Sequence, residues 1–269
     1  MNMSDVFSEQ EIRRGLGTKL VGKDIHIFDE LGSTNDLAKT MASNGAPSGT
    51  VILADSQTKG RGRMGRSFIS PPGVGIYLSI ILRPTLPPGR LPIITLGSGV
   101  AVARAVNEVT DLKILLKWPN DLILNTKKAG GILTEGKIEN DEMSFIIIGI
   151  GLNVNTEIEH FPSDLLPLVT SLKAEKGEWI SRTALVKELL KQIEWIFFQL
   201  EQGCEERIIK EWSDYSTTLG KWIRVSSQNS VIEGLAERLD ETGAMVLRRS
   251  DGQLERITAG EVTIIKDFK

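Results

Sequence analysis

The pattern of apolar and polar positions changes once along this chain, close to residue 220. Before that point, short apolar runs typical of buried strands, such as Thr50–Ala54 and Gly75–Leu82, alternate with helical patterns. After it, the period becomes two, and short stretches are separated by tight turns. The pattern predicts an α+β chain with a larger unit over residues 1–218 and a small, separate β-barrel over residues 219–269.

Capping signals and periodicity place the elements of the larger unit. Ser8 with Glu11 forms a capping box, which predicts a short helix over residues 8–17, and Ser33 with Asp36 predicts a helix that ends near Gly45. Further helices are expected over residues 91–109, 181–202 and 205–215. Further strands are expected over residues 24–31, 113–116 and 122–124, with a hairpin of residues 129–139 and 143–155.

The most unusual stretch is the loop Asp55–Phe68, DSQTKGRGRMGRSF, which follows a buried strand. Glycines let its backbone turn and approach a ligand, and cations crowd the same short segment. The glycines are Gly60, Gly62 and Gly65, and the cations are Lys59, Arg61, Arg63 and Arg66. Such a loop can wrap an anion with main-chain N–H groups and guanidinium groups together. We expect it to be mobile when empty, because it has no apolar anchor before Phe68.

The glycine spacing matches G-x-G-x-x-G, but a dinucleotide site is not the right interpretation. That fingerprint requires a helix opening at the glycines and an acidic residue about 20 positions later. Here Pro71, Pro72 and Gly73 follow, and Arg83 stands near the expected acidic position. Taken alone, the loop could also be a solvated basic turn without a function.

Composition narrows the classes of partner. The net charge of −3 gives no overall attraction to nucleic acid or to an anionic membrane, so the positive charge is local to the loop. The single cysteine, Cys204, excludes an internal disulfide and suits a reducing cytoplasm. No segment reaches the roughly 18 apolar residues of a membrane span, so we expect a cytoplasmic protein without membrane contact.

Four further motifs accompany the loop in a fixed order: Ser33–Asn35, Lys117–Asp121 (KWPND), Lys128–Glu135 (KAGGILTE) and Gly149–Asn155 (GIGLNVN). In this combination they closely resemble biotin protein ligase, the biotin–[acetyl-CoA-carboxylase] ligase family. The resemblance covers residues 24–155 by motif and the β-rich tail by position and length. It departs from the family pattern at Met64, the loop's variable position, and at Phe68, where the family has tryptophan.

The resemblance implies a fold and a reaction. The catalytic domain is expected to have a mixed sheet similar to class II aminoacyl-tRNA synthetases, followed by an SH3-like barrel. Biotin and MgATP would give biotinyl-5′-AMP and pyrophosphate, and the biotinyl group would then pass to a lysine of a biotin carboxyl carrier protein. The DNA-binding domain of repressor-type members is absent from the pattern, so sequence-specific DNA binding is not expected. A homodimer is possible.

The resemblance also implies roles for individual residues. The expected catalytic groups are Lys128, Arg61, Arg63 and Lys117, because attack of a carboxylate on a phosphate needs positioned cations. The expected biotin-binding residues are Ser33, Thr34, Asn35, Gln57, Arg61, Gly62, Arg63, Lys128, Gly130 and Gly131. The expected ATP-binding residues are Arg63, Arg66, Phe68, Lys117, Trp118, Asn120 and Asn153. Asp121 is expected to bind Mg²⁺.

Each of these roles has a plainer alternative. Ser33 fits an ordinary helix cap, Asp121 fits a turn, and Trp118 fits the core almost as well as a nucleotide site.

Two other functions are alternatives for the whole protein. A lipoate–protein ligase would use the same acyl-adenylate chemistry. A nonenzymatic binder of RNA or of an acidic partner is disfavoured by the net charge and by the few aromatic residues near the loop.

Overall fold

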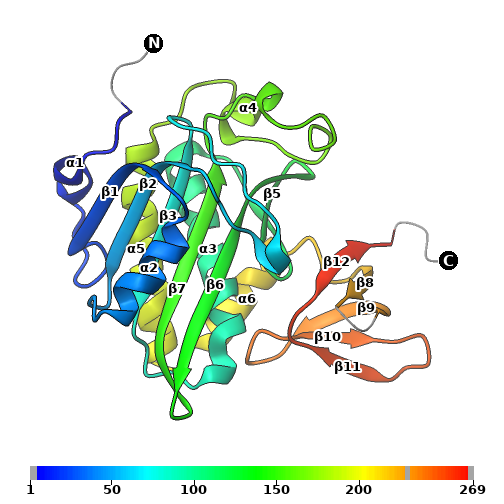
Figure 1. The fold of residues 1–269 in the computed structure, drawn as a ribbon. Helices are drawn as coiled ribbons and strands as arrows, with labels where there is room; N and C mark the ends of the chain where they lie inside the picture. The colour runs from blue at the N-terminus through cyan, green and yellow to red at the C-terminus, as the bar shows by residue number, and fades with distance from the viewer. Residues whose placement is uncertain (1–4, 228–230, 266–269) are drawn as a thin grey trace.

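A computed structural model describes residues 5–227 and 231–265, which form two sheets with helices packed on the larger one (Figure 1). The larger sheet has the strand order β1-β2-β3-β7-β6-β5-β4. Its strands are β1 (Asp24–Leu31), β2 (Thr50–Gln57), β3 (Gly75–Leu82), β4 (Leu115–Lys117), β5 (Asp121–Leu124), β6 (Lys127–Glu139) and β7 (Glu142–Asn153). Among these strands only β1 and β2 pair in parallel, which makes the sheet mixed, as the family resemblance implied.

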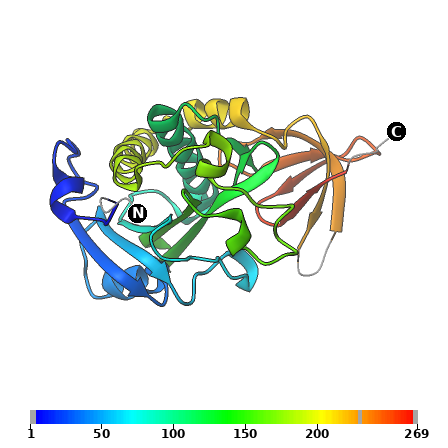
Figure 2. The same cartoon turned by 90° about the horizontal axis from the view of Figure 1, so that it is seen from above.

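The helices cover the two faces of this sheet unequally. They are α1 (Glu9–Arg13), α2 (Thr34–Ser43), α3 (Leu91–Thr110), α4 (Leu172–Lys176), α5 (Arg182–Glu201) and α6 (Glu205–Tyr215). Figure 2 shows α3, α5 and α6 on one face, while α2 lies on the other. Ser33 and Ser181 cap α2 and α5 as predicted, by accepting hydrogen bonds from the backbone N–H groups of Asp36 and Ala184. The first helix is shorter than the predicted 8–17, since it spans only Glu9–Arg13. The Ser8 side chain makes no capping hydrogen bond, so the predicted capping box is not formed.

Strand β7 explains how one sheet supports both a core and a site. Ile148 and Ile150 belong to the large apolar core under α3 and α5. Because side chains alternate across a strand, Gly149 and Gly151 lie on the opposite face, the face of α2. A smaller apolar cluster packs beneath α2, and its buried members are Ala38, Ala42, Ile52, Ile81, Phe145 and Ile147. On the sheet face that carries α2, the glycines of β7 therefore leave space for polar side chains next to the helix.

The C-terminal segment forms a five-stranded antiparallel sheet with the order β11-β10-β9-β8-β12. Its strands are β8 (Trp222–Ser226), β9 (Val231–Leu239), β10 (Met245–Arg248), β11 (Leu254–Ile257) and β12 (Glu261–Ile264). Several contacts attach this part and the segment before it to the large sheet, two of them at the sheet's edge. The Thr217 N–H donates to the Leu116 carbonyl at 2.8 Å, and the Trp118 indole N–H donates to the Gly243 carbonyl at 3.3 Å. Across the described residues, no helix is long and apolar enough to cross a membrane.

Candidate active site

The basic loop folds as an irregular hairpin across the α2 face of the sheet. Its arms pair through Phe68 N–H to the Gly60 carbonyl at 2.9 Å and Gly62 N–H to the Arg66 carbonyl at 2.7 Å. At Gly60, an added Cβ would lie 2.3 Å from the Phe68 carbonyl oxygen, so this position requires glycine. The tip turns at Met64, whose φ of 54° is rare for a residue with a side chain.

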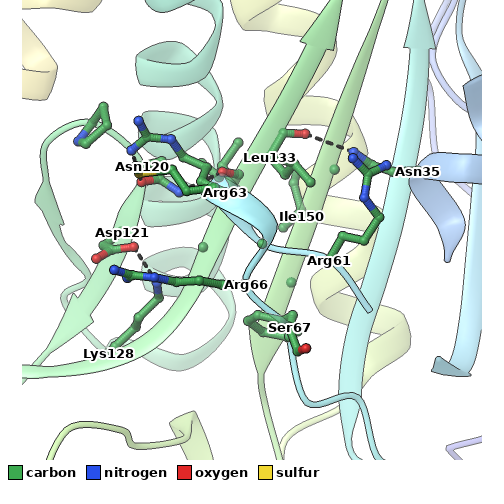
Figure 3. Close-up of a pocket in the computed structure, with 18 of the residues that line it drawn as sticks. Asn35, Arg61, Arg63, Arg66, Ser67, Asn120, Asp121, Lys128, Leu133 and Ile150 are labelled. Carbon is green, nitrogen blue, oxygen red and sulfur yellow. Dashed lines mark hydrogen bonds and ion pairs between the residues drawn. The ribbon is translucent and has the colours of Figure 1, made fainter. Parts of the chain in front are cut away.

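Beneath this hairpin lies a pocket of about 140 Å³ (Figure 3). It is lined by the loop, the start of α2, the β4–β5 turn, β6 and β7. All the predicted site residues except two are in its lining, namely Ser33, Thr34, Asn35, Gln57, Arg61, Gly62, Arg63, Arg66, Phe68, Lys117, Trp118, Asn120, Asp121, Lys128 and Gly131. Segments that are more than 100 residues apart in the sequence meet here.

One end of the pocket is built from neutral hydrogen-bonding groups. The side-chain oxygen of Gln57 accepts from the Thr34 N–H at 2.8 Å, and its amide nitrogen donates to Ser70 at 3.0 Å. Ser79 donates to Asn35 at 2.6 Å. Thr34 and Asn35 are buried, and these bonds orient them before any ligand arrives. Ser33 keeps its plainer role as the helix cap.

The other end carries positive charge. The Lys128 ammonium lies 2.5 Å from a carboxylate oxygen of Asp121. Arg63 donates to the Asn120 side chain at 3.1 Å and to the Gly260 carbonyl at 3.2 Å. Figure 3 shows Lys128, Asp121 and Arg66 on one side of the loop, with Arg63 beside Asn120. Asn120 is itself held by donation to the Ile132 carbonyl at 2.9 Å.

The three loop arginines have different electrostatic surroundings. Arg61 pairs with Asp36 and Glu135, and Arg66 pairs with Glu261, but Arg63 forms no ion pair with any described residue. Burial lowers the pKa of the Arg63 guanidinium below its ordinary value, although the charges of Asp121 and Glu261 oppose this effect. Arg63 is therefore a half-buried cation that lacks a counter-ion.

The glycines of β7 make room for the groups on the pocket side. A Cβ at Gly149 would lie 2.1 Å from the Asn35 side-chain oxygen, and a Cβ at Gly151 would lie 2.7 Å from the Phe68 ring. The motif GIGLNVN was noted in the sequence without a role for these glycines. Their role is steric, because they let Asn35 and Phe68 approach the sheet.

Two predicted site residues lie outside the pocket lining. Asn153 is buried and donates to the Thr170 carbonyl at 3.1 Å. At Gly130, an added Cβ would lie 2.3 Å from the Gly151 carbonyl oxygen, so this glycine serves strand packing. Gly131 does border the pocket, and its added Cβ would make an ordinary 3.5 Å contact with Lys128.

The sequence motifs missed the carboxylates and the C-terminal wall of the site. Glu135 ends the motif KAGGILTE and Asp36 follows the Ser33 helix cap, but neither pattern predicts an ion pair with the loop. Glu261 and Val262 also line the pocket, although they lie in β12 of the second sheet. No sequence signal marked these two residues, because only the docking of the two sheets brings them to the loop.

Two structural details bear on the predicted nucleotide and metal groups. Trp118 lines the pocket but is 2% exposed and is held by its bond to Gly243, so it is also a core residue. The predicted metal ligand Asp121 belongs to no group of three or more His, Cys, Asp or Glu that could hold a metal ion among the described residues.

Comparison with known proteins identifies relatives of this arrangement. Residues 28–153 match the sequence profile described as biotin/lipoate A/B protein ligase family, and residues 218–264 match the biotin protein ligase C-terminal domain. The bifunctional ligase/repressor BirA of Bacillus subtilis is 37% identical over 96% of this chain and 79% of its own length. The biotin–[acetyl-CoA-carboxylase] ligase of Mycobacterium tuberculosis is 28% identical over 94% of this chain and 95% of its own.

Solved structures agree with this result. Biotin protein ligase from Aquifex aeolicus, in complex with biotin and ATP, superimposes with a TM-score of 0.76 at 28% identity. The match covers 91% of this chain and 100% of that one. The Leishmania major enzyme in complex with biotinyl-5-AMP gives a TM-score of 0.62 at 26% identity, over 88% of this chain and 99% of that one. The resemblance seen in the motifs is thereby confirmed: this chain belongs to the biotin protein ligase family.

Proposed function

We propose that this protein is an ATP-dependent biotin ligase. It activates biotin to biotinyl-5′-AMP with release of pyrophosphate and then transfers the biotinyl group to a lysine of a biotin carboxyl carrier protein. The observation that carries the proposal is a single pocket with a neutral hydrogen-bonding end and a cationic end, closed over by the basic loop. Relatives with this architecture are named biotin ligases, and their solved complexes hold biotin, ATP or biotinyl-5-AMP.

The neutral end suits the ureido ring of biotin. A urea offers two N–H donors and one carbonyl acceptor, and Ser33, Thr34, Asn35 and Gln57 supply complementary hydroxyl and amide groups. Biotin's carboxylate would then point toward Lys128. Arg61 and Gly62, also on the loop, border the same space.

The cationic end suits the reacting anions. Adenylation brings the biotin carboxylate against the α-phosphate, and this repulsion must be offset by fixed positive charge. Lys128 and Arg63 are the groups we assign to the carboxylate and the α-phosphate, with Lys117 and Arg66 toward the remaining phosphates. To bind an anion, Lys128 has only to exchange its present partner, Asp121, for the substrate.

Mg²⁺ is expected to accompany ATP, and the residues fit it in a limited way. Mg²⁺ is usually held by one or two carboxylates together with substrate phosphates, and it retains several waters. Asp121, 25% exposed at the cationic end, can supply one carboxylate. When bound, the ion would neutralise charge on the departing pyrophosphate.

The nucleotide and domain assignments extend the proposal. Phe68, Trp118 and Asn120 form the part of the lining that we assign to the adenine and ribose. Asn153 would support this side indirectly, through Thr170. We also propose that residues 1–218 form a catalytic domain similar to class II aminoacyl-tRNA synthetases and that residues 219–269 form an SH3-like barrel.

An ATP–pyrophosphate exchange assay tests the reaction. Exchange that depends on biotin, and that lipoate does not support, is the expected result. Exchange supported by lipoate instead would make this chain a lipoate ligase, and no exchange with either acid would contradict the proposal. Mass spectrometry of a carrier domain incubated with biotin and ATP would show whether the transfer follows.

We place the protein in the cytoplasm, with a carrier domain of a biotin-dependent carboxylase as its partner and with a homodimer as a possible state. Its net charge of −3 disfavours nonspecific association with DNA, and we expect no sequence-specific binding. A gel-shift titration that showed salt-resistant, sequence-selective binding with biotin and ATP present would contradict this expectation.

A further inference from the structure

Arg61 has surroundings that do not suit a ligand for substrate anions. Its Nη2 donates to one carboxylate oxygen of Glu135 at 2.9 Å, and its Nη1 lies 3.3 Å from the other. The same Nη1 also pairs with Asp36. One cation therefore stands between two carboxylates, and the trio carries a formal charge of −1. A further anion beside it would meet repulsion from two carboxylates at close range.

The three residues come from three separate elements. Arg61 is on the first arm of the loop, Asp36 is in the first turn of α2, and Glu135 is on β6. The contact therefore ties the loop down to both the helix and the sheet. Arg61 also pairs with Ser67 on the other arm of the hairpin. A contact that holds Arg61 in place therefore holds both arms near the tip.

Glu135 has a second function in this arrangement. The same carboxylate oxygen that faces Arg61 Nη1 accepts a hydrogen bond from the buried Asn35 amide at 2.9 Å. Glu135 thus connects the closed loop to a group that we assign to the ureido ring. Its side chain is 23% exposed, so solvent screens this contact less than it screens the pair with Asp36, which is 57% exposed.

The pKa values of Arg61 and Arg63 are shifted in opposite directions, which also indicates different roles for the two arginines. Burial alone would lower the pKa of the Arg61 guanidinium, but the hydrogen bonds and charges of Glu135 and Asp36 outweigh it and raise the pKa above its ordinary value. The pKa of Arg63, two residues further along, is lowered by burial. Arg61 is ion-paired with two carboxylates, whereas Arg63 forms no ion pair with any residue that the structure describes.

We propose that Asp36, Arg61 and Glu135 form a loop latch, in which Arg61 is a positioning residue that holds the loop over the pocket so that Arg63 faces the reacting anions. The latch keeps a closed conformation populated before ligand binding. It rests on the proposed function for its role in catalysis, but its effect on the loop does not require any substrate.

Tryptic cleavage of the unliganded protein tests the latch directly. Mass spectrometry follows cleavage after Arg63 and Arg66. These two sites are present in every variant, so tryptic sites that a substitution adds or removes elsewhere do not affect the comparison. Glu135→Gln and Asp36→Asn keep the side-chain shape but remove a charge. We expect each to speed loop cleavage about two- to fivefold, the size of effect that partly exposed ion pairs have. Glu139→Gln, on the same strand and ion-paired with Lys137 instead of with the loop, is the matched control and should leave loop cleavage unchanged.

A charge swap separates a positioning role from ligand binding. Arg61→Glu alone should open the loop and slow biotin-dependent pyrophosphate exchange. In the double variant Arg61→Glu with Glu135→Lys, the cation moves to position 135 opposite the new glutamate, and the net charge of the trio is preserved. We expect the double variant to recover loop protection and part of the exchange rate.

Two results would overturn the latch. One is a swap variant whose loop is cut as fast as that of Arg61→Glu, and the other is loop cleavage in Glu135→Gln equal to that of the wild type. Recovery of loop protection without any recovery of exchange, in a double variant that still binds biotin and so has not lost Asn35 as a ligand, would identify Arg61 as an anion ligand instead. Absence of biotin-dependent exchange in the wild-type protein would remove the proposed function but leave the cleavage comparison valid.

Discussion

At the scale of single residues, the site depends on one lysine that has an ion-pair partner and one arginine that does not. Lys128 is held by Asp121, and the hydrogen bonds of Arg63 to described residues go to neutral oxygen atoms. A paired lysine stays oriented in the empty pocket, whereas an unpaired, half-buried arginine gains most when an anion arrives. Both properties follow from which carboxylates the fold places nearby.

Loss of the Lys128 ammonium should abolish most of the activation step. We expect Lys128→Ala to slow biotin-dependent pyrophosphate exchange by about 10²- to 10³-fold, as for loss of one preorganised charge-stabilising group. Lys127→Ala, the adjacent cation outside the pocket lining, is the control and should retain activity. Near wild-type exchange in Lys128→Ala would end the assignment.

The two glycines of β7 should affect different substrates. In Gly149→Ala the new methyl group would press on the buried Asn35, so we expect a higher KM for biotin and a loss of about 1–3 kcal/mol in stability from overpacking. In Gly151→Ala it would displace the half-buried Phe68 ring, so the KM for ATP should rise with a smaller loss of stability. Steady-state kinetics and thermal unfolding of both variants would check this, and equal effects on the two KM values would count against it.

At the scale of elements, the loop is the part whose state should change with ligand. Its hairpin is fastened to α2 and β6 by Arg61 and to β12 by Arg66, and Arg63 between them has no ion-pair partner in the described part of the chain. An acyl-adenylate supplies the missing anion, so it should strengthen closure and shield the mixed anhydride from water.

Biotin with ATP should therefore slow tryptic cleavage after Arg61, Arg63 and Arg66. Arg63→Gly should weaken retention of the adenylate more than it weakens folding, because a half-exposed loop contributes little to the core. Released adenylate would then acylate lysines of bystander proteins, which blotting for biotin detects. Lys59→Gly, in the same loop but outside the pocket lining, is the control. Equal cleavage with and without saturating ligands would contradict closure of the loop.

At the scale of the whole molecule, the second sheet completes the site. Gly260 accepts from Arg63, Glu261 pairs with Arg66, and Gly243 holds Trp118. The two sheets are thus connected through the loop and through the KWPND turn, in addition to the apolar core that their residues share. Their relative placement affects the shape of the pocket as well as stability.

The contact of Glu261 with Arg66 should depend on pH. The hydrogen bond from Arg66 holds the pKa of the Glu261 carboxyl below its ordinary value, although partial burial opposes this effect. Its stabilisation is therefore fully present above the ordinary pKa of a glutamate and is lost as the pH falls through the lowered value. Both side chains are about half exposed, so less than about 1 kcal/mol is involved. The difference in unfolding temperature between wild type and Glu261→Gln should shrink toward zero in acid, and a constant difference would contradict this.

Local sequence signals determined much of this protein. Continuous apolar runs over residues 75–82 and 143–155, and the caps Ser33 and Ser181, predicted main strands and helices, because apolar patterning and capping act within a few residues. The motifs predicted the family, which the comparisons confirmed, and nearly all the pocket lining.

Only the tertiary structure decided which charges meet. Asp36 and Glu135 are separated by about a hundred positions, and Glu261 lies in the other sheet, yet these carboxylates pair with arginines of one loop. It also turned Asn153 away from the pocket, toward Thr170. No periodicity encodes such pairings, because they depend on how the two sheets and α2 pack together. The sequence thus determined which groups are available for the chemistry, and the packing determined which of them are left without a partner for the substrate to bind.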